Sequence, residues 1–197
     1  FTQLIESYVS TRANSFTDAL ALDGIKAVIE GFILAWHGGD TDKARFGRNK
    51  MAYASLLSGI TLAQVGLGSV HGLASPLGAF FPIPHGVVCG TLLAEATQLN
   101  ISAMQERDDE NIALVKYATI GRLISKDFRI NDIMSFSNLV SILNDWTELF
   151  ELPRLSQYGV TKDDFKRIVA DSRGSSMKTN PIVLTDSEIK MILTKRL

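Results

Sequence analysis

The residues best suited to chemistry are two histidines, His71 and His85, out of only three in the chain. They lie fourteen residues apart, in a segment (66–86) that is rich in glycine and holds three of the five prolines. Neutral imidazole is the commonest protein ligand for zinc, iron and nickel. A catalytic metal site usually needs three protein ligands, however. On residue type and spacing alone, two hydrogen-bonded histidines near helix ends are therefore the favoured interpretation.

The elements that must position these histidines are predicted to be helices. Apolar residues recur at helical spacing along most of the chain, starting with Leu4, Ile5, Tyr8 and Val9, and no stretch alternates long enough for a strand. Ser15 or Thr17 is expected to cap the first long helix. The segment 66–86 is expected to be irregular. The expected helices cover 16–36, 42–65, 85–105, 111–124, 135–149, 161–172 and 185–197. We therefore predict one all-α domain over residues 1–197.

Composition bounds the possible functions. The hydrophobic content of 46% is typical of a globular protein. The net charge of −1 gives no excess of positive charge of the kind that attracts nucleic acid or an anionic membrane. No apolar run is long enough for a transmembrane helix. The single cysteine, Cys89, excludes an intrachain disulfide and fits a reducing compartment, so we expect a cytoplasmic protein. Because the sequence opens at Phe1 inside a helical pattern, we expect a piece of a longer protein.

The histidine segment closely resembles a family signature. It reads Gly-Leu-Gly-Ser-Val-His71-Gly-Leu-Ala-Ser-Pro-Leu-Gly and, further on, Pro-His85-Gly, which is similar to the iron-containing (group III) alcohol dehydrogenases. Similar stretches occur at 2–10, 17–20, 49–59 and 180–186, so the resemblance covers the whole chain. It implies the C-terminal, multi-helix, metal-binding domain of the dehydroquinate synthase-like fold, with the N-terminal nucleotide-binding domain absent from this chain. No glycine-rich phosphate loop after a strand is present here.

The resemblance also implies a site. The family holds its metal with one aspartate and three histidines, and the aspartate position would fall before Phe1. The implied metal ligands are His71, His85 and Gln3, and the implied substrate-pocket residues are Ser75 and Leu62. Phe80 lies between the two histidines in the sequence and is either a further wall of the substrate pocket or a core residue. Glutamine is a poorer ligand for iron or zinc than imidazole. The serine at position 75 stands where the family has a histidine, and serine cannot titrate near neutral pH.

The function implied is hydride transfer between an alcohol or aldehyde and NAD(P), assisted by Fe²⁺ or Zn²⁺. The implied partners are the small substrate and the N-terminal domain, with a homo-oligomer as a candidate assembly and no nucleic acid or membrane. Because only two of four ligands are kept, we expect weak or no metal binding and no activity for residues 1–197. The alternative is a helical domain that kept the fold, lost the site and serves as a structural or interaction module. Within the enzyme class, a polyol dehydrogenase or a maleylacetate reductase-type relative is the nearest competitor.

Three other polar residues have simpler interpretations. Cys89 lies one turn after His85, within reach of an ion there, but we expect a small buried apolar residue. His37 precedes two glycines and is expected to end a helix. Glu6 lies one turn after Gln3 and is either a partner of a metal ligand or a structural carboxylate.

Overall fold

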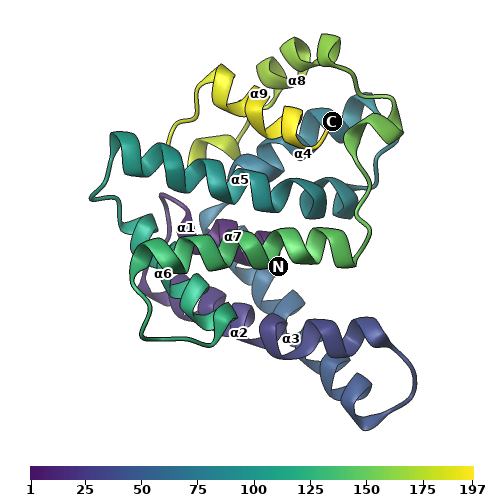
Figure 1. Cartoon of the computed structure of the whole chain (residues 1–197), viewed down its shortest axis with the longest axis vertical. Helices are drawn as coiled ribbons and strands as arrows, with labels where there is room; N and C mark the ends of the chain where they lie inside the picture. The colour runs from purple at the N-terminus through teal and green to yellow at the C-terminus, as the bar shows by residue number, and fades with distance from the viewer. The chain divides into compact units, whose positions relative to one another are not determined.

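The computed structural model describes all 197 residues, and its regular elements are all helices (Figure 1). The all-α prediction is confirmed. The chain folds as two compact units, Phe1–Gly66 and Leu67–Leu197. A single domain over residues 1–197 stays a prediction. No single helix is both long enough and apolar enough to cross a membrane. The consecutive helices Asp42–Val65 and Ser69–Phe80 meet the length and composition criteria only when the two are taken together.

Three helices form the first unit. They are α1 (Thr2–Val9), α2 (Ser15–His37) and α3 (Asp42–Val65), and each packs against the other two. Helices α2 and α3 approach closely because glycines line the contact. A Cβ added to Gly47 would lie 2.5 Å from the backbone nitrogen of Ala35 and 2.7 Å from the carbonyl oxygen of Gly31. Only glycine at this position lets the two helices pack so tightly.

The cap of α2 corrects one expectation. Asn14 is the N-cap residue, so the prediction that Ser15 or Thr17 would cap this helix was wrong. The Asn14 side chain accepts hydrogen bonds from the backbone N–H groups of Phe16 and Thr17. In return, the Thr17 hydroxyl accepts one from the backbone N–H of Asn14, which completes a capping box. Asparagine is among the best N-cap residues because its short amide reaches these otherwise unpaired donors.

Six α-helices form most of the second unit. They are α4 (Ser69–Phe80), α5 (His85–Arg107), α6 (Ile112–Ser125), α7 (Asp132–Leu149), α8 (Phe165–Asp171) and α9 (Asp186–Lys195). Short 3₁₀ turns occupy Leu155–Tyr158, Lys162–Asp164 and Met177–Thr179. Helix α5 is central, because α4, α6, α7 and α9 all pack against it (Figure 1). Helix α5, which carries the candidate ligand His85 at its first residue, is thus held by other helices on several sides.

Helix α4 is the main departure from expectation, because it lies inside the segment 66–86 that was predicted to be irregular. The break at Gly66 is real: this residue ends α3 with a φ of 73°, which favours glycine. The chain then re-enters a helix at Ser69 and stays helical through Pro76, although proline removes one backbone donor. Burial explains this, since Val70 and Leu77, among others on the same face, are almost fully buried.

The remaining helices occur where expected, with shifted ends. The predicted helix 161–172 is split into a 3₁₀ turn and α8, and α7 begins earlier than predicted, at Asp132. Capping boxes are present at Thr161 and Thr185. Apart from α4, the sequence-based prediction therefore differs from the structure mainly at the helix ends.

Replacing Gly121 with alanine is expected to destabilise the protein. Helices α6 and α7 cross at this glycine, and an added Cβ would overlap the carbonyl oxygen of the buried Ser135. The helices would have to separate, so the free energy of unfolding should fall by about 1–3 kcal/mol. Denaturant unfolding followed by circular dichroism measures this change. Gly78→Ala is the control: nothing lies near its added Cβ, so stability should be unchanged or higher.

Candidate metal centre

His71 and His85 are brought together from two helices. They lie on α4 and α5, which residues 81–84 connect. The two ring centroids are 5.4 Å apart, and the ring planes are tilted by 55°. His71 is only 8% exposed, whereas His85 is exposed at the first position of α5. The pair therefore has a buried side and a side open to solvent.

The turn before α5 orients His85. Pro84 occupies the N-cap position with a φ of −57°, and its carbonyl oxygen accepts hydrogen bonds from the N–H groups of Val87 and Val88. Ile83 is 95% buried, since its relative exposure is only 5%, and it anchors the connection. A proline followed at once by a helix restricts the backbone. The direction in which His85 leaves the helix is thus set by the turn.

Cys89 completes a cluster with the two histidines. Its Sγ lies 3.5 Å from Nε2 of His71 and 3.5 Å from Nε2 of His85. The three potential ligand atoms all lie within 4.8 Å of one another. Cys89 was expected to be a small buried apolar residue, and it is buried, but its sulfur faces both rings. The signal was the spacing from His85, since residues four apart share a helix face.

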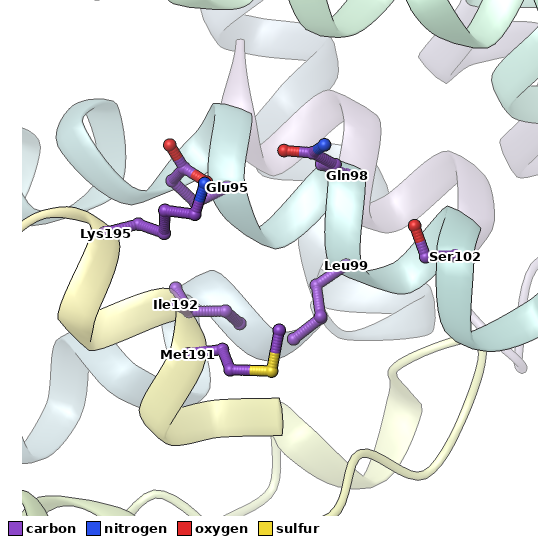
Figure 2. A pocket seen from close by; sticks show the side chains of 7 residues that line it. All are labelled: Glu95, Gln98, Leu99, Ser102, Met191, Ile192 and Lys195. Atoms are coloured by element: carbon purple, nitrogen blue, oxygen red, sulfur yellow. The ribbon is translucent and has the colours of Figure 1, made fainter. Parts of the chain in front are cut away.

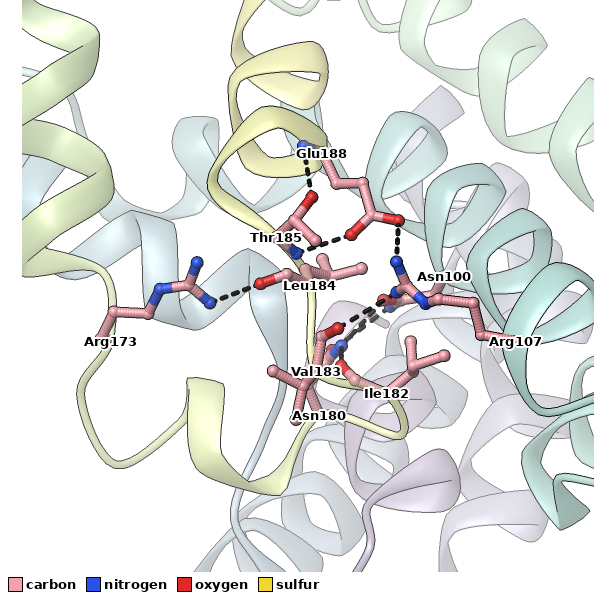
Figure 3. A network of polar contacts seen from close by, with 9 residues as sticks. All are labelled: Asn100, Arg107, Arg173, Asn180, Ile182, Val183, Leu184, Thr185 and Glu188. Atoms are coloured by element: carbon pink, nitrogen blue, oxygen red, sulfur yellow. Dashed lines mark hydrogen bonds and ion pairs between the residues drawn. The ribbon is translucent and has the colours of Figure 1, made fainter.

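A buried amide pair anchors the helix that carries His71. The Asn180 side-chain oxygen accepts a hydrogen bond of 2.9 Å from the backbone N–H of Ser69, at the start of α4. Its side-chain nitrogen donates to Asn100 of α5, at 2.8 Å, and to the carbonyl oxygen of Ile182. Figure 3 shows Asn100 and Asn180 meeting at the centre of this network. Because both asparagines are buried, these bonds fix the start of α4 relative to α5.

The same network reaches Glu188 at the start of α9 (Figure 3). Partial burial alone would raise the pKa of this carboxyl. The backbone N–H and hydroxyl of Thr185 and the guanidinium of Arg107 stabilise the carboxylate more strongly, so the pKa lies below its ordinary value. The carboxylate thereby joins the end of α5 to the beginning of α9.

Glu188→Gln is expected to reduce the acid sensitivity of folding. A carboxyl with a lowered pKa in the folded state stabilises the protein above its unfolded pKa. That stabilisation is lost as the pH falls through the lowered value. Unfolding free energies measured from neutral to acidic pH should therefore decline less steeply in the variant. Asp109→Asn removes an exposed carboxyl and should keep the wild-type slope; equal slopes for wild type and Glu188→Gln would refute the assignment.

Two predicted pocket residues lie in the second unit. Ser75 is exposed on α4, one turn after His71. Phe80 is 37% exposed at the end of the same helix, and its ring lies 4.8 Å from the guanidinium carbon of Arg167. This contact gives Phe80 a structural role in joining α4 to α8. The assignment of both residues to a substrate pocket stays a prediction.

The other predicted residues lie in the first unit. Gln3 is on α1, and its side-chain oxygen is within 2.9 Å of the Ser58 hydroxyl of α3, which can donate to it. Leu62 is half-buried on α3. Glu6 is buried on α1. The roles of Gln3 as a metal ligand and of Leu62 as a pocket wall stay predictions.

A separate pocket lies between α5 and α9 (Figure 2). It has a volume of about 210 Å³, and its walls include Glu95, Leu99, Met191 and Lys195. None of the residues that the sequence predicts for the site lines it. Side chains that could bind a metal ion converge instead at the cluster of His71, His85 and Cys89.

The chain is similar in sequence to known alcohol dehydrogenases. Residues 1–197 match the model for the Fe-containing alcohol dehydrogenase family, C-terminal. Alcohol dehydrogenase 4 of Saccharomyces cerevisiae is 30% identical over 196 residues, covering 98% of this chain and 47% of that protein. The NADPH-dependent butanol dehydrogenase of Clostridium saccharobutylicum is 30% identical over 200 residues, covering 97% and 47%. The chain thus spans about half the length of these curated relatives.

The fold is also similar to solved structures. A crystal structure of 1,3-propanediol oxidoreductase superposes with a TM-score of 0.87 and 26% sequence identity. The superposition covers 100% of this chain and 49% of that one. The predicted fold, a multi-helix C-terminal domain of the iron-containing alcohol dehydrogenase type, is confirmed.

Proposed function

Because the chain belongs to the iron-containing alcohol dehydrogenase family and corresponds to its C-terminal domain, we propose that it is the metal-binding half of an NAD(P)-dependent oxidoreductase. The reaction would interconvert an alcohol and an aldehyde. The observation that carries the proposal is the convergence of His71 and His85, from α4 and α5, onto one small volume.

The donor atoms at this place fit a divalent transition metal. Two imidazole nitrogens within a few ångström of each other suit Zn²⁺ and Fe²⁺. When bound, such an ion acts as a Lewis acid on the substrate oxygen and favours the alkoxide form of the alcohol. His71 and His85 would hold the ion rather than exchange protons with the substrate.

The surroundings of the two histidines suit this role. His71 projects from a helix whose start is fixed by the buried amide of Asn180, so the backbone that carries the ring is held in place. His85 is exposed, which leaves the outer side of the site accessible to a small alcohol. A rigid inner side and an open outer side are what a metal-assisted reaction requires.

The hydride acceptor would bind outside residues 1–197. Nicotinamide cofactors supply the hydride chemistry, and the relatives are about twice as long as this chain. One of them is named an NADPH-dependent butanol dehydrogenase, which supports a small alcohol as substrate class. We therefore place the cofactor in a nucleotide-binding domain that completes the enzyme.

The test is an assay of the complete protein that contains this chain. Reduction of NAD⁺ or NADP⁺ should be observed with a panel of primary alcohols after loading with Fe²⁺ or Zn²⁺. Chelation should abolish the activity, and His85→Ala should lower kcat/KM by at least about 100-fold. Absence of any alcohol-dependent reduction would instead support the alternative of a helical module without a metal site. Activity that survives chelation would refute the role of the metal.

A further inference from the structure

The distances from the Cys89 thiol to the two histidines match those of a metal centre. In a tetrahedral zinc site, Zn–N bonds of about 2.0–2.1 Å and Zn–S bonds of about 2.3 Å place nitrogen and sulfur about 3.6 Å apart. The Sγ atom of Cys89 lies 3.5 Å from Nε2 of His71 and 3.5 Å from Nε2 of His85. Both separations agree with a shared ion.

A bound ion accounts for both contacts at once. A thiol has one hydrogen, so it can donate to only one imidazole nitrogen at a time. The second contact would then require a ring N–H that donates to sulfur, which is a weak acceptor. Coordination of the thiolate and of both Nε2 atoms to one cation satisfies all three atoms together.

We infer that Cys89 is the third protein ligand of this centre, and that the centre prefers Zn²⁺ to Fe²⁺. The inference rests on the proposed function only for the role of His71 and His85. A thiolate is a soft, anionic donor that suits zinc and partly offsets its charge. On binding, the S–H bond breaks, the Zn–S bond forms and the proton passes to solvent. Three protein ligands leave a fourth tetrahedral position for a water molecule or the substrate oxygen.

The helix geometry holds the thiol in this place. Cys89 follows His85 by one turn of α5, so both side chains lie on the same face. The neighbouring Val88 and Leu92 are completely buried, and a Cβ on Gly90 would lie 3.0 Å from a methyl carbon of Leu152. Helix α5 cannot turn about its axis without unpacking these contacts, so the sulfur stays directed at the two rings.

This ligand set changes the expectation of weak metal binding. That expectation was based on a site that keeps only two of the family's four metal ligands and has no negatively charged ligand. The thiolate of Cys89 supplies both a third donor and a negative charge, all within the second unit. Stable metal binding by the 197-residue chain then requires neither Gln3 nor an upstream aspartate.

Cobalt absorption of the 197-residue chain tests the inference. Co²⁺ bound by a thiolate shows a sulfur-to-cobalt charge-transfer band in the near ultraviolet, and Cys89 is the only cysteine in the chain. The wild-type chain, loaded without oxygen and under reducing conditions, should show this band. Cys89→Ser and Cys89→Ala should lose it, retain the weaker visible bands of bound cobalt, and bind at least about tenfold more weakly. X-ray absorption of the zinc form should show one sulfur at about 2.3 Å.

The outcomes separate this inference from the proposed function. Cobalt binding without the charge-transfer band, and with equal affinity in Cys89→Ser, would overturn the role of Cys89 and leave the histidine pair intact. No binding by the wild-type chain would overturn the inference, whereas the proposed function is decided by the assay of the complete protein. Tighter binding of Fe²⁺ than of Zn²⁺ in direct competition would overturn the metal preference. Matching circular dichroism spectra of the variants and wild type establish that the variants are folded.

Discussion

Replacing His71 with alanine is expected to lower the affinity of the 197-residue chain for Zn²⁺ by at least about 100-fold. The ring is held at 5.4 Å from that of His85, and its Nε2 lies 3.5 Å from the Cys89 sulfur, so its loss removes a ligand from the buried side of the site. The only histidine outside the pair is His37, which is not a member of the cluster. Competition with a chromophoric chelator measures the change.

His37→Ala is the matched control. This histidine is exposed at the last position of α2, in the first unit, and is not a member of the cluster. Its replacement should leave the zinc affinity unchanged. Equal affinity losses for His37→Ala and His71→Ala, or no loss for His71→Ala in a folded protein, would contradict the assignment.

Asn180→Ala is expected to reduce the free energy of unfolding by about 2–4 kcal/mol, because at least two buried polar groups lose their partners. The Ser69 N–H loses its acceptor and the Asn100 amide loses its closest partner. Both asparagines are almost completely buried, so water cannot replace these bonds at low cost. Because the same amide fixes the start of α4, zinc affinity should also fall. Denaturant unfolding and zinc titration of the same preparation measure the two effects.

Asn49→Ala provides the control for this variant. Asn49 is exposed within α3, where alanine is the better helix former, so stability should be unchanged or slightly higher. If Asn180→Ala were as stable as Asn49→Ala, the amide network would not anchor α4.

Local sequence patterns predicted much of the fold. Apolar periodicity located α2, α3, α5 and α6 to within a few residues, and Gly66 was correctly expected to break the chain. The start of α5 at His85 was also expected, because a proline such as Pro84 suits the first turn of a helix. These features depend on near neighbours in the chain, which a sequence displays directly.

Other features depend on contacts between distant residues. Helix α4 persists through Pro76 because the second unit buries its apolar face, which no local pattern reports. The hydrogen bond from Ser69 to Asn180 joins residues 111 positions apart. The approach of Cys89 to His71 likewise depends on how α4 packs against α5. Tertiary packing therefore determined the features that the sequence alone did not predict.

The metal content of the wild-type chain tests the central claim most directly. The reduced protein would be incubated with Zn²⁺, dialysed extensively against metal-free buffer and analysed by mass spectrometry for metal and protein. With His71, His85 and Cys89 as ligands, we predict about one tightly held zinc ion per chain. A chain that retains no zinc after dialysis would contradict the account.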